Sequence, residues 1–393
     1  MAKIINLKPF KDFFGSESTG GVLLMIGVAI SLLLANSSIN NGFENLLQSN
    51  IGFKISTIDL NYSVIQWIND GLMAIFFLMV GLEIKRELIE GELSSVKQAS
   101  LPVIAAIGGM LVPAILYSLV NQAPLTKHGW GIPMATDIAF AIAILSFLGN
   151  KVPNSLKVFL TALAIVDDLG AILVIAIFYS KEIHIDYLLY AGGILIFLVG
   201  MNFFGVKKLI FYLIPGAIMW YFIHHSGIHA TIAGVLTAFT IPTNTSDKES
   251  PLEKLEHALV KPVNYLIMPI FAIANTNIRF ESNMFENVAS SLSLGILAGL
   301  IIGKPLGIFS FSWIAVKLKA SKLPAKTRWS QIAGLGLLGG IGFTMSIFIA
   351  LLSFSEVEFH TQAKFAILIA SFTSGILGFT ILKFLGEKKR EFQ

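Results

Sequence analysis

The most regular feature of the sequence is a succession of long apolar runs, separated by short segments rich in charge, glycine, proline or asparagine. A helix needs roughly 20 apolar residues to cross the hydrocarbon core of a bilayer, because it rises about 1.5 Å per residue. The runs therefore predict membrane-spanning helices. Twelve spans are expected, at residues 20–36, 62–82, 99–120, 130–148, 158–179, 187–204, 209–223, 228–241, 262–278, 288–316, 332–354 and 365–382.

Composition agrees with a single all-α membrane domain over residues 1–393. Hydrophobic residues make up 55% of the chain, charged residues 13%, and the mean hydropathy is +0.76, which excludes an ordinary soluble domain. The absence of cysteine excludes a disulfide framework and thiolate chemistry. The net charge of +4 is explained by topology, since most Lys and Arg residues fall in segments that are cytoplasmic if both termini are cytoplasmic. We expect lipid as a partner and no nucleic acid.

The fifth span contains two adjacent acids, Asp167 and Asp168, in an otherwise uncharged run. A charge at the centre of a spanning helix costs on the order of 3 kcal/mol, so such residues usually face a cavity and serve a function. Neighbouring positions on a helix are rotated by about 100°, so the two carboxylates face different surroundings. Carboxylate oxygens suit a small hard cation and also bind protons. The pair predicts a site where a cation and protons compete; structural hydrogen bonding is the alternative.

Two spans carry residues that interrupt a helix. The fourth contains Pro133, Thr136 and Asp137, a helix-start signature placed inside the membrane, and the eleventh contains five glycines between Gly334 and Gly342. DIAFAIAILSF in the fourth resembles TMSIFIALLSF in the eleventh at an offset of 207 residues. Paired broken spans in two halves are typical of secondary transporters. Close helix packing through small residues is an alternative that covers the glycines but not Asp137.

Two further charges lie inside spans. Lys304 is about midway along the tenth span, where it is most simply the counter-ion of one aspartate; snorkelling to the interface is the alternative. Asp137 and Lys304 also suit the two dipole ends of broken helices, a role that stays open beside direct cation binding. Asp70 lies near the outer face, with an access, capping or structural role. His229, like His224 and His225, fits an interfacial or packing position.

Charged residues gather in two segments expected on the cytoplasmic side, GLEIKRELIEGEL and PLEKLEHALVKP. One interpretation is a solvated helix end with the usual cytoplasmic lysines. The other is a charged mouth that attracts cations and responds to pH, with His257 as the group that titrates in the physiological range.

Seven motifs closely resemble, in order and spacing, the NhaA family of bacterial sodium/proton antiporters: GLEIKREL, IPMATDIAFA, ALAIVDDLGAI, HSGIHATIAG, LEH, GKPLGI and GGIGFTMSIFI. Together they extend over nearly the whole chain. The resemblance implies a twelve-helix inner-membrane protein with an inverted repeat, an arrangement already known for this family of transporters. It also implies that the fourth and eleventh spans are unwound and cross near the membrane midplane.

The resemblance further implies roles for matching residues. Asp168 would be the principal Na⁺ ligand, with Asp167 sharing the cation and proton site and pairing with Lys304. Thr136 and Asp137 would lie at the crossing, where Asp137 compensates dipoles. A pH-responsive cytoplasmic funnel would contain Glu83, Arg86, Glu87, Glu256 and His257. Some members have a second histidine shortly after LEH, where this chain has ALVKPVN, so its pH set-point is expected to differ.

The sequence thus predicts an electrogenic Na⁺(Li⁺)/H⁺ antiporter that works by alternating access and is regulated by pH. We expect no cofactor and no enzymatic activity, a bacterial inner-membrane location, and both termini in the cytoplasm. The long outer loop between the first two spans is compatible with a homodimer. A sodium-coupled symporter of an organic anion is the main alternative. A channel would lack coupled proton movement, and an intramembrane aspartyl protease is disfavoured because adjacent aspartates diverge.

Overall fold

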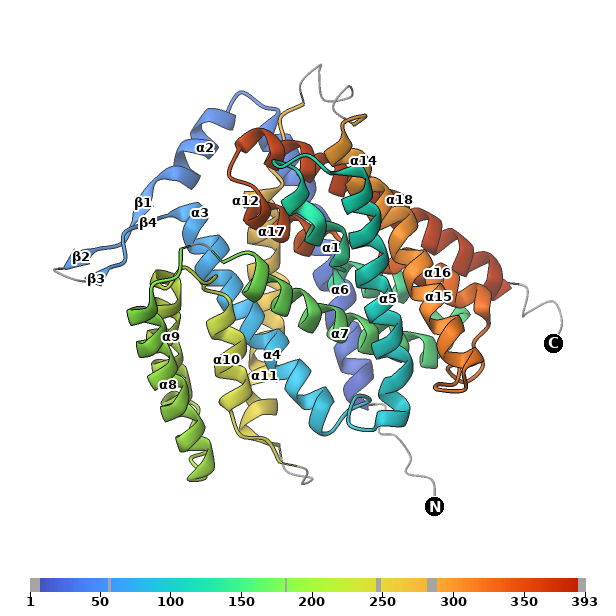
Figure 1. The fold of residues 1–393 in the computed structure, drawn as a ribbon, viewed down its shortest axis with the longest axis horizontal. Coiled ribbons are helices and arrows are strands. Elements are labelled where there is room, and N and C mark those ends of the chain that lie inside the picture. Colours follow the sequence, from blue (N-terminus) through green and yellow to red (C-terminus); the bar gives the residue numbers. More distant parts are fainter. Residues whose placement is uncertain (1–7, 56–57, 181, 245–248, 281–287, 388–393) are drawn as a thin grey trace.

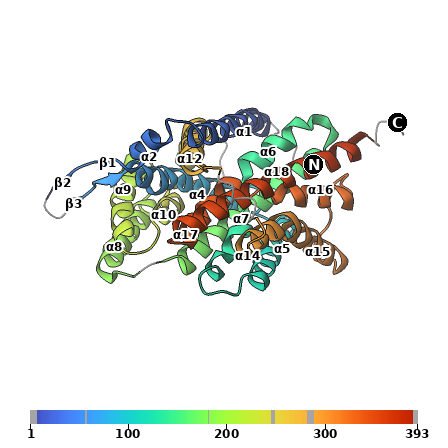
Figure 2. The ribbon, with the colours of Figure 1, turned by 90° about the horizontal axis from the view of Figure 1, so that it is seen from above.

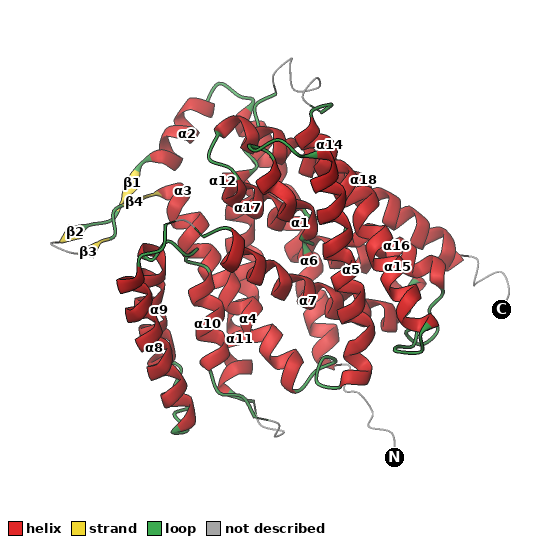
Figure 3. Ribbon diagram, viewed as in Figure 1, coloured by secondary structure: helices red, strands yellow, loops and turns green. Residues whose placement is uncertain are grey.

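Apolar runs form helices here because a helix satisfies its backbone hydrogen bonds internally, which a membrane requires. The computed structural model describes residues 8–55, 58–180, 182–244, 249–280 and 288–387. In this part of the chain nearly all secondary structure is helical (Figures 1 and 3). Two small antiparallel pairs, β1 (Asn50–Ile51) with β4 (Tyr62–Ser63) and β2 (Lys54–Ile55) with β3 (Ile58–Asp59), form the exception. The predicted all-helical class is confirmed.

A helix overlaps each of the twelve predicted ranges. Some are continuous through a π-helical turn: α3 (Val64–Gln66) joins α4 (Met73–Ile89), α11 (Pro251–Pro262) joins α12 (Met268–Asn275), and α14 (Ser291–Leu297) joins α15 (Lys304–Lys317). The others are α1 (Lys8–Ala35), α2 (Asn40–Gln48), α5 (Val96–Val120), α6 (Ile138–Phe147), α7 (Asn154–Phe178), α8 (Ile185–Phe203), α9 (Ile210–His225), α10 (Ile232–Thr240), α16 (Trp329–Gly339), α17 (Phe343–Ser353) and α18 (Val357–Glu387).

Length and hydropathy qualify eight of the described helices as candidate membrane spans, or up to ten if each of two bent pairs counts as one. One bent pair is α16 with α17, at 47°. The apolar helices α9, with 16 residues, and α10, with 9, are too short by this measure. Several apolar helices thus fit a multi-pass membrane protein, and the count of twelve spans stays a prediction.

The helix of the ninth predicted span extends beyond the apolar range. It starts at Pro251, whereas the predicted span begins at residue 262, so the charged segment PLEKLEHALVKP is also helical. Ser250 and Glu253 form a capping box with each other, and proline at the first helical position is favourable. The helix continues past Pro262 through the π-helical turn Val263–Ile267. Glu256 and His257 therefore lie on a regular helix.

Glycines allow α5 and α15 to approach closely. An added Cβ at Gly307 would lie 2.1 Å from the Gly108 carbonyl oxygen, and one at Gly108 would lie 2.4 Å from that of Gly307. Such contacts are too short for any other residue. Close packing at this level fixes the backbone next to Lys304, three residues before Gly307.

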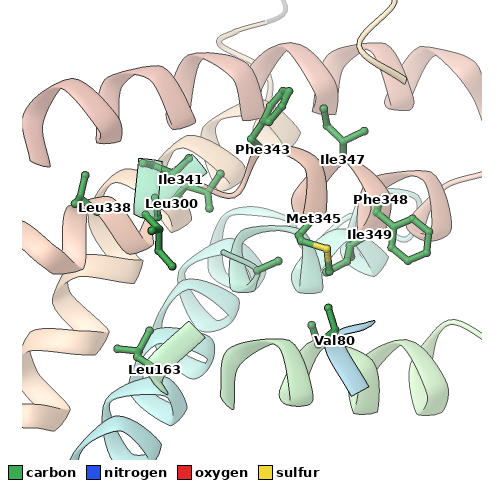
Figure 4. Close-up of a cluster of buried hydrophobic side chains, with 14 of the residues drawn as sticks. Val80, Leu163, Leu300, Leu338, Ile341, Phe343, Met345, Ile347, Phe348 and Ile349 are labelled. Atoms are coloured by element: carbon green, nitrogen blue, oxygen red, sulfur yellow. The ribbon is translucent and has the colours of Figure 1, made fainter. Parts of the chain in front are cut away.

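Buried apolar side chains enclose the centre of the molecule. Every residue from Ile341 to Ala350 is buried, and Figure 4 shows Phe343 and Ile347 pointing to one side of α17 and Met345 and Ile349 to the other. Seen from above, α7 lies between α1 and α12 on one side and α5, α14 and α15 on the other (Figure 2). A second apolar cluster joins α8, α9 and α10. Interrupted helices at the centre are thus surrounded by protein, where irregular backbone is tolerated at membrane depth.

The substitution Gly307→Leu should lower the stability of the folded protein, because the new side chain meets the backbone of α5. Overpacking of this kind costs about 1–3 kcal/mol or more. Apparent melting temperature of the detergent-purified protein is the measurement. Gly193→Leu is the matched control, since a Cβ at Gly193 meets nothing within 4 Å. Equal melting temperatures for the two variants would contradict the packing described.

Candidate functional site

Two interrupted helices cross at the centre of the molecule. The first is the 3₁₀ segment Lys127–Met134, followed by non-helical Ala135 to Asp137 and then α6. The second is α16, followed by non-helical backbone and then α17. Direct hydrogen bonds join them: Thr136 Oγ1 donates to the Gly339 carbonyl (2.8 Å), and the Asp137 amide donates to the Ile341 carbonyl (2.7 Å). Each break thus satisfies backbone groups that the other exposes.

Asp137 caps two helices at this crossing. Its Oδ1 accepts from the Phe140 amide of α6 (3.0 Å), and its Oδ2 accepts from the Thr344 amide (3.1 Å) and hydroxyl (2.5 Å) of α17. A carboxylate stabilises the positive end of a helix dipole, and here it faces two such ends. The sequence reasoning did not single out Thr344. In the alignment of DIAFAIAILSF with TMSIFIALLSF, however, Thr344 is the residue that corresponds to Asp137, 207 positions later.

Lys304 lies fully buried beside the crossing. Its Nζ is 2.5 Å from Asp167 Oδ2, and both side chains have 0% exposure. The same ammonium donates to the carbonyl of Met134, which ends the 3₁₀ segment and has no helical partner of its own. Lys304 therefore neutralises a carboxylate and the negative end of an interrupted helix at once.

Asp168 occupies a different environment from its neighbour. Its side chain is 2% exposed and, among the residues that the structure describes, it has no hydrogen bond or ion pair. It borders a cavity of about 50 Å³ whose lining also includes Glu83, Asp137, Glu256 and Thr344. A buried carboxylate without a partner is costly unless a proton or a cation compensates it. The arrangement suits reversible binding of a proton or a small hard cation.

Arg86 organises the charged end of this cavity. Its Nε lies 3.0 Å from both carboxylate oxygens of Glu256, and its Nη1 lies 2.8 Å from Glu87 Oε1. Because Arg86 belongs to α4 and Glu256 to α11, the contacts connect two of the helices that line the cavity. Between α4 and α5, partial burial and the nearby Glu87 carboxylate raise the pKa of Glu92.

Three predicted site residues lie away from the cavity. The side chain of His257 is 66% exposed and contacts Glu249 (3.0 Å), so it is outside the cavity although its neighbour Glu256 lines it. Asp70 belongs to the π-helical turn Trp67–Leu72, about 20 Å along the helix from Glu83. There it lies 3.4 Å from His229 and 3.7 Å from His224. Their placement stems from tertiary packing that sequence spacing does not reveal.

The description "Na+/H+ antiporter 1" belongs to the family model that matches residues 11–382. The chain belongs to this family. It is 62% identical to a Na(+)/H(+) antiporter NhaA 2 from Flavobacterium johnsoniae, over 100% of this chain and 96% of the relative. A Na(+)/H(+) antiporter NhaA from Flavobacterium psychrophilum is 52% identical over 96% of each chain, and one from Yersinia pestis is 47% identical over 97% of this chain and 98% of its own. The resemblance stated from seven motifs is confirmed.

Family membership leaves individual roles to be judged from geometry. The crossing brings together Thr136, Asp137, Asp167 and Lys304, and the cavity brings together Asp168, Glu83 and Glu256. Sequence reasoning missed two further polar lining residues, Thr344 and Asn264. The position of Thr344 in the repeat was a usable signal. For Asn264 the sequence offers only its spacing of eight residues from Glu256.

Lys304→Met should destabilise the protein by about 3–5 kcal/mol, because it leaves the buried Asp167 carboxylate without its charge partner. Apparent melting temperature measures the effect. The double variant Lys304→Met with Asp167→Asn should recover much of the loss, since no unpaired charge remains. A single variant as stable as the unmodified protein would show that the ion pair is not what neutralises Asp167.

Proposed function

We propose that the chain exchanges Na⁺ or Li⁺ for H⁺ at Asp168. The observation that supports this most directly is that Asp168 is buried, has no side-chain partner among the described residues, and borders a cavity lined by further carboxylates. The names of the relatives, which are Na⁺/H⁺ antiporters, support the same activity. The transported ions are substrates, and the proposal requires no cofactor.

Competition for the Asp168 oxygens is the proposed basis of coupling. A proton neutralises the carboxylate at low pH, and a sodium ion does so when protons are scarce. An empty, charged site is costly to bury, so only a proton-loaded or sodium-loaded site would reorient between the two faces of the membrane. The interrupted helices are the proposed moving elements, because each has a break between its two halves.

The paired charges beside Asp168 add an electrical consequence. Asp167 and Lys304 form one neutral unit when paired, and loss of a proton from this unit during sodium binding would make two protons move for each Na⁺. Net positive charge would then enter as sodium leaves, gaining about 2.3 kcal/mol per elementary charge at 100 mV. Such electrogenic exchange would expel sodium without a pH gradient.

The cytoplasmic face is the proposed side of regulation. Lysine and arginine placement supports an inner-membrane protein with both termini in the cytoplasm, which puts Glu83, Arg86 and Glu256 on that side. A change of charge at this end of the cavity, near which Glu87 and the exposed His257 also lie, would control access to Asp168. We also propose that the protein forms a homodimer in the lipid bilayer.

Asp168→Asn should abolish exchange, because an amide neither releases a proton nor supplies a charged ligand. The assay uses everted membrane vesicles from cells lacking other antiporters, energised to acidify the interior and followed with a pH-sensitive dye as NaCl, LiCl or KCl is added. Sodium and lithium, but not potassium, should restore fluorescence in the unmodified protein. Asp186→Asn, an exposed acid in the first turn of α8, is the control.

Normal exchange in Asp168→Asn would remove this residue from the proposed role. No response at any pH from folded, unmodified protein would instead refute antiport. A sodium-coupled symporter would then be tested by solute uptake, although a cavity of about 50 Å³ is far smaller than the roughly 300 Å³ or more of ordinary organic ligand pockets.

The apparent KM for Na⁺ should fall as the outer pH of the vesicles rises, by about tenfold per pH unit where binding displaces only the Asp168 proton and by up to about hundredfold where the Asp167–Lys304 unit releases its proton as well. At higher pH, where the site is already deprotonated, KM should level off. Initial rates over a grid of pH and Na⁺ concentration measure this. A KM that is independent of pH would contradict competition at one carboxylate.

A further inference from the structure

Two neutral polar side chains line the cavity, Thr344 at the crossing and Asn264 on the helix that also carries Glu256. Glu256, Val260, Asn264 and Met268 all border the cavity and follow each other at intervals of four residues, so they form one helical face. Eight residues of helix place Asn264 about 12 Å deeper than Glu256. On this face Asn264 is the polar residue nearest to the level of the crossing.

The backbone at Asn264 is held in a defined position. The residue lies in the π-helical turn Val263–Ile267, a conformation often found at functional sites. Gly20 of α1 packs directly on it: a Cβ added there would lie 3.0 Å from Asn264 Cβ and 3.4 Å from its carbonyl oxygen. The residue as a whole has a relative exposure of 9%, and its carboxamide carbon would lie 3.7 Å from a Cβ at Gly20.

The Asn264 carboxamide is also uncommitted. Among the residues that the structure describes, no hydrogen bond is found for it, and neither of its polar atoms is one of the fully buried side-chain atoms that lack a partner, so the amide is accessible where the residue borders the cavity. An amide that serves only the fold would be expected to bond a neighbouring backbone group, as the Asn275 side chain does with the Phe271 carbonyl (3.0 Å). The free carboxamide therefore points to a ligand or solvent in the cavity.

The small size of the cavity indicates what the Asn264 carboxamide could do there. A volume of about 50 Å³ holds only a few water molecules, since each water needs roughly 10–15 Å³ of space accessible to its centre. A sodium ion moving through it must exchange part of its hydration shell for protein oxygens, and hard carbonyl oxygens are suitable replacements. A neutral amide provides such an oxygen without adding another negative charge that would hold the ion.

We propose that the Asn264 carboxamide oxygen is a Na⁺ ligand on the path between Glu256 and Asp168, and that it sets the apparent affinity for the ion from the cytoplasmic side. This inference rests on the proposed antiport. It assigns Asn264 a role in substrate binding that is separate from proton exchange at Asp168. Li⁺, which is smaller and more strongly hydrated, needs the replacement oxygen at least as much.

Asn264→Ala tests the inference, because it keeps the Cβ that packs on Gly20 and removes only the carboxamide. In everted vesicles the apparent KM for Na⁺ should rise by about tenfold, the equivalent of about 1.4 kcal/mol, while the maximal rate at saturating Na⁺ stays within about twofold of the unmodified protein. Asn264→Asp keeps an oxygen at the same place and should leave KM unchanged or lower. Leu266→Ala, in the same π-helical turn but 58% exposed, is the control.

A second measurement does not depend on transport. Sodium that binds the folded state raises its melting temperature, and Asn264→Ala should need about tenfold more Na⁺ for the same rise. An unchanged KM and an unchanged sodium dependence of melting in Asn264→Ala would overturn the inference while antiport stands. Equal loss in Asn264→Ala and Asn264→Asp would also overturn it, since an oxygen ligand would be preserved in the second. Failure of antiport itself would appear in the unmodified protein.

Discussion

The structure depends on satisfying backbone groups that are exposed where two helices are interrupted at the buried centre of the molecule. In such apolar surroundings each unsatisfied group costs several kcal/mol. The chain meets this constraint with Thr136 and Asp137 on one segment and with the carbonyls of Gly339 and Ile341 on the other. Lys304 supplies the remaining donor, to Met134. Each of these groups is buried, so the crossing is built from polar contacts enclosed by apolar helices.

This constraint separates the two adjacent aspartates. Lys304 is fixed at the crossing by the Met134 carbonyl, and it lies beside Asp167, so that carboxylate is committed to an ion pair. One position further along α7, rotated by about 100°, Asp168 faces the cavity instead. A pair of identical residues thereby acquires two environments from helix geometry alone. The neutralised pair and the unpartnered acid therefore offer two different settings for a proton beside one cavity.

Sequence reasoning reached the helices, the two interruptions and the charged residues inside spans, because each of these is a local pattern with a large energetic cost if misplaced. It did not give the start of α11 at Pro251, where a capping box begins the helix within a polar segment. Nor did it separate Glu256, which lines the cavity, from the exposed His257. Asn264 and the contact of Asp70 with His224 and His229 depend on how distant helices pack. Such contacts leave no periodic signal in the sequence.

Arg86 joins two of the helices that line the cavity, and it does so at the charged end of the cavity. Arg86 belongs to α4 and donates hydrogen bonds to Glu256 of α11, so its contacts join these two helices. Residues of both helical segments, Glu83 and Asn264 among them, line the cavity. With a volume of about 50 Å³ the cavity holds only a few water molecules, so a change in the spacing of these helices would alter whether an ion and its remaining waters fit. Because a carboxylate that takes up a proton loses its strongest attraction to a guanidinium, protonation of Glu256 would weaken this link. In the proposed regulation, a change of charge on Glu256 would thus act on Asp168 through the spacing of α4 and α11, without direct contact between the two carboxylates.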